Sequence, residues 1–234
     1  MNAILEVAGV SKAYGALRPL RIRELSVAPG ESIAIVGLDA GAAEILVNLI
    51  TGATLPDAGD IRIFGRATSA IADSSDWLST VDRFGIVSDR AVLLDQLSIV
   101  QNLSMPFTLD VEPPPDEVRA QAAALAREVG VDAASLDVPI GIAGDEARTR
   151  VRLGRALALD PQVLLLEHAT ATLANDTAHS FGADVRTIAA RRGIAVVALT
   201  ADERFAGAVA SRVLVHHPAD GTLGERRRRW FGRG

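Results

Sequence analysis

Short apolar segments of strand length alternate along this chain with segments of helical periodicity, and this alternation limits the possible fold most. Strands are predicted at residues 32–36, 84–87, 163–166 and 195–199, and helices at 42–52, 117–129, 146–159 and 176–192. Gly193 is predicted to end the last helix in a left-handed conformation. Strands separated by helices of about 10–17 residues imply an α/β fold with a mainly parallel sheet covered by helices.

Two regions differ from this alternation. Residues 3–36 are rich in β-strand patterns, with segments 4–7 and 20–27 before a turn at Ala28-Pro29-Gly30-Glu31. A further turn at residues 56–59 precedes a strand at 60–64. Between about residues 90 and 145 the pattern changes to helices and loops, interrupted by Pro113-Pro114-Pro115.

Composition excludes several classes of protein. Apolar residues make up 49% of the 234 residues, which excludes a disordered chain, and the absence of cysteine excludes disulfides and zinc–thiolate sites. The formal charge of −5 argues against a nucleic-acid partner, and one of the 24 basic residues is a lysine, Lys12. No apolar run approaches the ~18–20 residues of a membrane span, and the N-terminus lacks a signal-peptide pattern. A cytoplasmic location is therefore predicted, with membrane attachment through a partner.

A set of short motifs follows one another along nearly the whole chain. They are Tyr14-Gly15, Pro29-Gly30-Glu31, Gly37, Leu49-Ile50-Thr51-Gly52, Pro56-Asp57-Ala58-Gly59, Phe84-Gly85-Ile86-Val87, Gln101-Asn102, Arg155-Ala156-Leu157, Asp160-Pro161 and Val163-Leu164-Leu165-Leu166. In this order and at these spacings they resemble the ATP-binding cassettes of ABC transporters, particularly those of lipoprotein-release and macrolide-export systems. The resemblance implies a P-loop NTPase-like cassette with a mainly parallel core sheet, an N-terminal antiparallel β lobe and a helical lobe over about residues 90–145. One domain, 1–224, would then be followed by a basic tail, 225–234.

The phosphate-binding loop of that family, G-x-x-x-x-G-K-[ST], is changed in this chain at the positions that contact phosphate and metal. Gly37 and Gly41 are present, but Ala42 replaces the second motif glycine and Ala43 replaces the lysine. Glu44 stands where the family has the hydroxyl that binds Mg²⁺.

The remaining catalytic positions are changed as well. Asp89 stands in place of the family glutamine, and the signature stretch at 143–147 contains Gly144 and Asp145. Glu167 and His168 replace the Asp-Glu pair after the 163–166 strand, and the switch histidine becomes Ala201. Tyr14, at the adenine-stacking position, is retained. The resemblance therefore predicts degenerate equivalents of the catalytic residues at Glu167, His168 and Ala201.

Carboxylates stand near both helix N-termini that would receive phosphate: Glu44 on the first, Asp145 and Glu146 on the second. A carboxylate there gains roughly 0.3–1 kcal/mol from the helix dipole when exposed, so these acids are expected to replace the missing phosphate electrostatically. We therefore expect no cofactor, no metal site and no Mg-ATP binding. ATP and Mg²⁺ would enter only if the chain were a divergent but active ATPase, with Glu167 on the metal and His168 or a partner residue as base.

Other interpretations remain open at this point. Asp39, Glu44, Asp89 and Glu167 could converge into an acidic pocket for Mg²⁺ or Ca²⁺, although solvated or capping carboxylates are the commoner case. His168 could be structural, Tyr14 could pack on a sheet edge, and the whole chain could be a soluble scaffold that reuses the fold.

The leading prediction is a catalytically degenerate cassette subunit, a pseudo-ATPase, of a membrane transport complex. It would dock on transmembrane subunits through the groove around residues 89–107, and it would form a homo- or heterodimer of cassettes. Its location would be the cytoplasmic face of the cell membrane. The tail Arg226-Arg227-Arg228-Arg229-Trp230-Phe231 suits anionic lipid headgroups, or is a solvated end.

Overall fold

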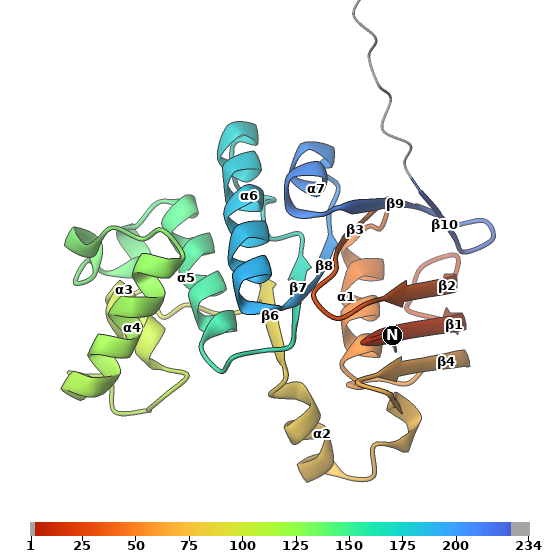
Figure 1. The fold of residues 1–234 in the computed structure, drawn as a ribbon, viewed down its shortest axis with the longest axis horizontal. Helices are drawn as coiled ribbons and strands as arrows, with labels where there is room; N and C mark the ends of the chain where they lie inside the picture. The colour runs from red at the N-terminus through yellow and green to blue at the C-terminus, as the bar shows by residue number, and fades with distance from the viewer. Residues whose placement is uncertain (1–2, 226–234) are drawn as a thin grey trace, which may run out of the picture.

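A six-stranded sheet forms the centre of the molecule in this computed structural model, which describes residues 3–225 (Figure 1). In order across the sheet its strands are β10 (Thr222–Glu225), β9 (Arg212–His217), β3 (Ser32–Val36), β8 (Ala195–Leu199), β7 (Val163–Glu167) and β6 (Phe84–Ser88). Strands β9, β3, β8, β7 and β6 pair in parallel, and β10 runs antiparallel to β9. The predicted mainly parallel core sheet is confirmed.

Successive residues of the central strands face two hydrophobic cores on opposite sides of the sheet. In β7, Leu164 and Leu166 belong to one core and Val163 and Leu165 to the other. The first core is covered by α6 (Asn175–Arg192) and α7 (Glu203–Val209). The second is covered by α1 (Ala40–Ile50) and the N-terminal strands. Strands buried on both faces explain why these segments are continuous apolar runs in the sequence.

The N-terminal β lobe is a separate antiparallel sheet. Its order is β2 (Leu20–Val27), β1 (Leu5–Lys12), β4 (Ala58–Ile63) and β5 (Arg66–Ala67). Val7 of β1 lies opposite Leu25 on one side and Ile61 on the other. The prediction of a strand ending at residue 7 was wrong, because β1 continues to Lys12 after an irregularity in its pairing with β4 between Ala8 and Ser11.

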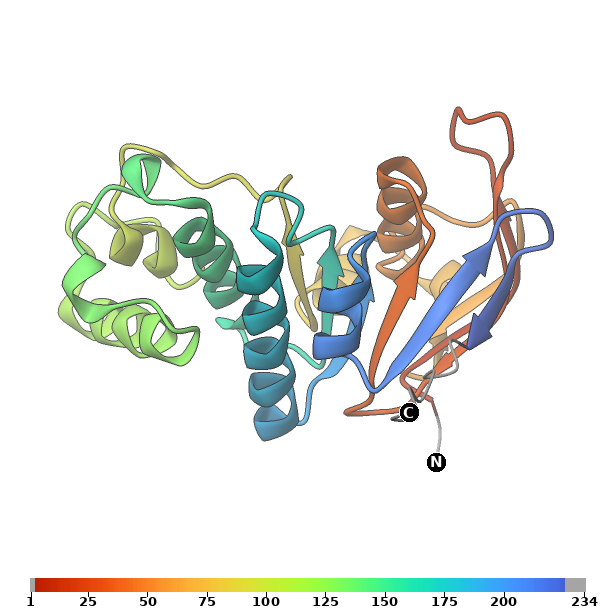
Figure 2. The same ribbon diagram turned by 90° about the horizontal axis from the view of Figure 1, so that it is seen from above.

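A helical lobe projects beyond β6 and contains α3 (Ile99–Ser104), α4 (Asp116–Glu128) and the start of α5 (Asp145–Leu157). Helix α5 also packs against β6, so one helix belongs to both the lobe and the core. From above, the helical lobe, the core sheet and the β lobe follow one another along the long axis (Figure 2). Short 3₁₀ turns lie at Thr68–Ala70, Ala133–Ser135 and Ile140–Ile142.

Helix boundaries differ from the predictions where caps decide them. Helix α1 was expected at 42–52, but Asp39 caps its start and Thr51 follows its last residue. Gly193 ends α6 at φ 69°, as predicted. The sequence did not predict α2 (Ser74–Val81), α3 or α7, because helices this short depend on tertiary packing rather than on their own propensity.

Within residues 3–225, no helix is long and apolar enough to cross a membrane. The proposed basic tail lies outside the described residues, apart from Glu225, so its contact with lipid stays a prediction.

Candidate functional site

The loop between β3 and α1 occupies the position predicted for phosphate binding. Gly37 has φ 92°, a conformation that favours glycine, and a Cβ atom there would make a tight contact of 3.1 Å with the backbone oxygen of His216. The loop leads into Asp39, whose Oδ1 accepts a hydrogen bond from the amide of Ala42 at 2.7 Å. An amide at the start of α1 is therefore already paired with a carboxylate of the same loop.

The prediction of which carboxylate stands at the N-terminus of α1 was wrong. Glu44 was expected to supply the carboxylate at the N-terminus of α1, but it lies in the second turn of that helix. Asp39 supplies the cap instead. Ala43, at the lysine position, is fully buried in the core beneath the loop.

Tyr14 lies against this loop. A Cβ atom on Gly41 would be 3.3 Å from Cε2 of the Tyr14 ring, so the ring covers the glycine closely. Tyr14 also packs on the second core. Burial, and to a lesser degree the charge of Asp39, raise the pKa of the Tyr14 phenol above its ordinary value of 10.0. The tyrosine therefore packs on the second core and on the loop glycine at the same time, and its stacking on adenine stays a prediction.

Glu44 and Glu167 are brought together by a residue that the sequence analysis did not single out. Arg90 donates through Nη1 to Glu44 Oε1 at 2.8 Å and through Nη2 to Glu167 Oε2 at 2.5 Å. The Glu167 side chain is 8% exposed, whereas Arg90 and Glu44 are 46% and 45% exposed. A guanidinium therefore lies between the two residues that stand where the family holds Mg²⁺.

The acidic pocket considered from the sequence is not formed. Asp89 pairs with Arg152 (3.2 Å), and Asp39 caps α1, so the four carboxylates do not share one site. No group of three or more potential metal-ligating side chains occurs among residues 3–225. Each of these acids has instead a protein partner.

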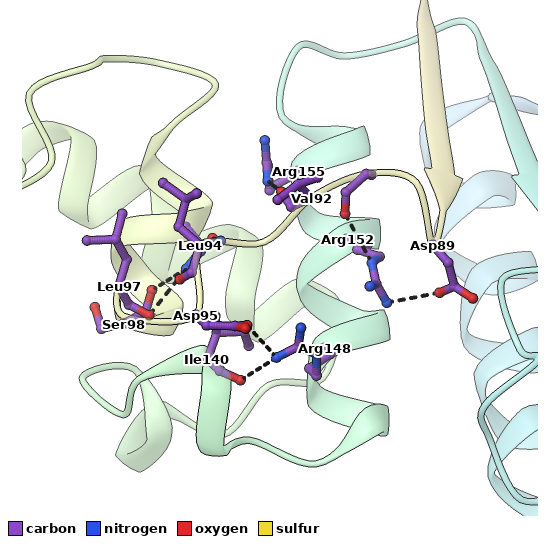
Figure 3. A network of polar contacts seen from close by, with 12 residues as sticks. Asp89, Val92, Leu94, Asp95, Leu97, Ser98, Ile140, Arg148, Arg152 and Arg155 are labelled. Atoms are coloured by element: carbon purple, nitrogen blue, oxygen red, sulfur yellow. Dashed lines mark hydrogen bonds and ion pairs between the residues drawn. The ribbon is translucent and has the colours of Figure 1, made fainter.

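Arginines of α5 hold the segment that follows Asp89 (Figure 3). Arg152 donates to the carbonyl of Ala91, and Arg155 donates to that of Val92 at 2.7 Å. One turn earlier, Arg148 reaches Asp95 at 2.9 Å. The sequence already contained a signal for these contacts, because arginines at positions 148, 152 and 155 are spaced to lie on one face of a helix.

At the start of α5, Gly144 is the N-cap and gives no side-chain hydrogen bond. Asp145 and Glu146 lie in the first helical turn and are exposed, which is the placement expected from the sequence. Glu146 also pairs with Arg150 at 3.0 Å. Negative charge therefore lies at the N-terminal ends of both helices, from Asp39 on α1 and from Asp145 and Glu146 on α5.

His168 and Ala201 line one open hollow of about 560 Å³ together with Thr170 and Thr200. His168 follows β7 with φ 43°, and its amide donates to the Leu199 carbonyl at 2.8 Å. Its Nε2 is buried and has no hydrogen-bond partner among the described residues. A general base must reach the proton that it abstracts, and the Nε2 atom of His168 is shielded from solvent.

Comparisons with known proteins agree with this arrangement of the chain. A family model described as "ABC transporter" matches residues 20–171. This chain belongs to the ABC transporter family. The predicted family is thereby confirmed.

Curated relatives in this family include ATP-binding proteins of bacterial import, lipoprotein-releasing and other ABC transporter systems. The methionine import ATP-binding protein MetN of Brucella abortus is 30% identical over 91% of this chain, which spans 57% of that protein's length. The lipoprotein-releasing system ATP-binding protein LolD of Maricaulis maris is 30% identical over 94% of this chain and 96% of its own. The ABC transporter ATP-binding protein YtrE of Bacillus subtilis is 30% identical over 85% and 84%.

Solved ABC structures share the fold at lower identity. CbiO1 from Clostridium perfringens, part of the transporter complex cbiONQ, superposes with a TM-score of 0.79 at 20% identity, covering 96% of this chain and 88% of its own. The dimeric ATP-binding cassette MJ0796, bound to ADP and Pi, gives 0.76 at 20% identity, covering 97% and 100%. The predicted cassette fold, with β lobe and helical lobe, is confirmed.

Proposed function

We propose that this chain is the cassette subunit of a membrane transport complex and that it neither binds nor hydrolyses Mg-ATP. It would be a pseudo-ATPase with a structural or regulatory role. The observation that carries this proposal is the loop before α1, which provides a carboxylate at Asp39 and no cation, since Ala43 is buried at the lysine position.

The electrostatics of the loop support the absence of nucleotide. ATP brings about three to four negative charges, which cassettes normally meet with a lysine, a metal and free helix amides. Here Asp39 occupies an α1 amide, and the Arg90 guanidinium lies between Glu44 and Glu167. The residues present do not fit Mg-ATP, because a triphosphate would meet the Asp39 carboxylate and a metal would have to displace Arg90.

Calorimetric titration with Mg-ATP tests this proposal, with an ABC cassette that retains the lysine as the positive control. We expect no saturable heat at physiological nucleotide concentration. Micromolar affinity, or ATP turnover by the purified protein alone or with its partner, would instead establish the divergent ATPase.

The partners proposed are transmembrane subunits, at the cytoplasmic face of the membrane, with a second cassette as a dimer partner. The docking surface would be a groove of about 370 Å³ between β6, the end of α3 and α5. It combines apolar residues such as Met105 and Leu159 with the guanidinium groups of Arg152 and Arg155.

Leu159→Glu tests the groove, because Leu159 is 56% exposed at its rim and tolerates a charge without loss of the core. Leu109→Glu is the matched control, because Leu109 is 91% exposed and does not line the groove. Recovery of the chain with a polytopic membrane protein in the membrane fraction should fall for the first variant and not for the second. Equal recovery of both variants would contradict docking here, and a wild-type chain found wholly in the soluble fraction would favour the scaffold.

A further inference from the structure

The dipeptide Asp89-Arg90 lies at the end of β6, where the chain leaves the core for the helical lobe. It begins a turn in which the amides of Arg90 and Ala91 donate to the side chain and carbonyl of Ser88. Two adjacent side chains of opposite charge are therefore positioned by a short, hydrogen-bonded turn.

Arg90 binds the core side of this junction. Its two terminal nitrogens pair with Glu44 of α1 and Glu167 of β7, at 2.8 and 2.5 Å. Glu167 is almost completely buried, so its charge needs a permanent positive partner. A single guanidinium can serve both carboxylates because its donors form a planar fork.

Asp89 binds α5, the helix that the lobe and the core share. It pairs with Arg152 of α5, and Arg152 and Arg155 also hold the carbonyls of Ala91 and Val92 (Figure 3). Asn102 of α3 completes the attachment through hydrogen bonds with the backbone of Leu94. The linker is thus bound to the core through Arg90, to the shared helix α5 through Asp89 and the two carbonyls, and to α3 of the lobe through Leu94.

We propose that Arg90 is a built-in cation that latches the helical lobe to the core in one position, independently of any nucleotide. This inference rests on the proposed absence of Mg-ATP binding, and it adds how the lobe is positioned without that ligand. A covalently attached guanidinium is always present at the two carboxylates, whereas a diffusing metal ion or nucleotide is bound only part of the time. The latch would present the docking groove in a constant shape to a transmembrane partner.

Arg90→Ala opens the latch, and Arg66→Ala is its matched control. Arg66 is 47% exposed, against 46% for Arg90, and its ion pair with Asp76 joins β5 to α2 and involves no residue of the helical lobe. Because the chain has no cysteine, spin labels can be placed at Ala120 of α4 and at Ala53 beside the core by cysteine substitution. Double electron–electron resonance spectroscopy then measures the distance between the two labels, which reports the position of the helical lobe relative to the core.

We expect a narrow distance distribution in the otherwise unmodified chain and in the Arg66→Ala variant, unchanged by Mg-ATP. The distribution should broaden in Arg90→Ala, and amide exchange over residues 89–94 should become about tenfold faster. The double variant Glu44→Gln/Glu167→Gln removes both negative charges that hold Arg90 and leaves no buried charge behind, so the distribution should broaden in this variant too, even if Arg90→Ala folds poorly.

An unbroadened distribution and unchanged exchange in both latch variants would overturn the proposal. Its failure is distinguishable from that of the proposed function. If calorimetry showed that the wild-type chain binds ATP, the proposed pseudo-ATPase function would be wrong, but the latch could still hold. If Mg-ATP changed the distance between the two spin labels, the proposal that the latch is independent of nucleotide would be wrong.

Discussion

Replacing Arg150 by methionine is expected to loosen the joint between helices α4, α5 and α6. Arg150 is a residue of α5 with 11% of its side chain exposed. Its guanidinium donates to the Val129 carbonyl at the end of α4 (2.7 Å) and pairs with Asp184 of α6 (2.9 Å) and Glu146 of α5 (3.0 Å). One side chain therefore connects three helices.

The stability lost in Arg150→Met depends on how exposed each partner of Arg150 is. The Val129 carbonyl loses a buried, charge-assisted hydrogen bond, at about 1–3 kcal/mol. Asp184 and Glu146 are 48% and 52% exposed and regain water, so each pair contributes only about 0.2–1 kcal/mol. Methionine retains the apolar stem of the side chain. We expect a total loss of about 1.4–5 kcal/mol in the free energy of unfolding, or about 3–20 °C in melting temperature for a chain of this size.

Urea unfolding followed by far-ultraviolet circular dichroism measures this loss. The control is Arg119→Met, whose pair with Asp137 is exposed (42% and 74%) and should contribute less than about 0.5 kcal/mol. The reasoning would be refuted if Arg150→Met stayed within about 0.5 kcal/mol of the wild type, or if the two variants lost equal stability.

Three further predictions concern the attachment of the lobe and the site loop. A hydrogen bond from Arg192, above all, lowers the pKa of Glu128 from its ordinary value of 4.5. The ionised carboxylate therefore stabilises the fold above pH 4.5, and this contribution is lost as the pH falls through the lowered pKa. When melting temperature is measured from about pH 6 down to about pH 3, it should fall more steeply for the wild type than for Glu128→Gln, and parallel curves would contradict this. Asp39→Ala removes the cap of α1 and should lower the urea-derived unfolding free energy by about 0.5–2 kcal/mol, whereas no loss would mean that the cap is not formed. Gly85→Ala would place a Cβ atom 2.4 Å from a backbone carbonyl of α5 and should lower the melting temperature, whereas the control Gly207→Ala meets no atom within 4 Å and should not; equal melting temperatures would refute this close approach of β6 to α5.

Regular elements with strong patterns were predictable from the sequence. The central strands are continuous apolar runs because both faces of the sheet are covered, and α6 ends at a glycine that can adopt the left-handed conformation. Short helices such as α3 were missed, although its capping box, Ser98 with Gln101, is a recognisable start signal.

The sequence by itself determined the family, the cassette fold and the loss of the lysine, since Ala43 can be read directly at its place in the motif. It did not determine which acid would take the place of phosphate, because this depends on where α1 begins: Asp39 became the cap and Glu44 turned toward Arg90. The tertiary structure alone decided that Arg90 would meet both Glu44 and Glu167, which are 46 and 77 residues away along the chain. Ion pairs form between charges that folding brings within a few ångströms, and that proximity arises from the packing of whole elements rather than from local sequence.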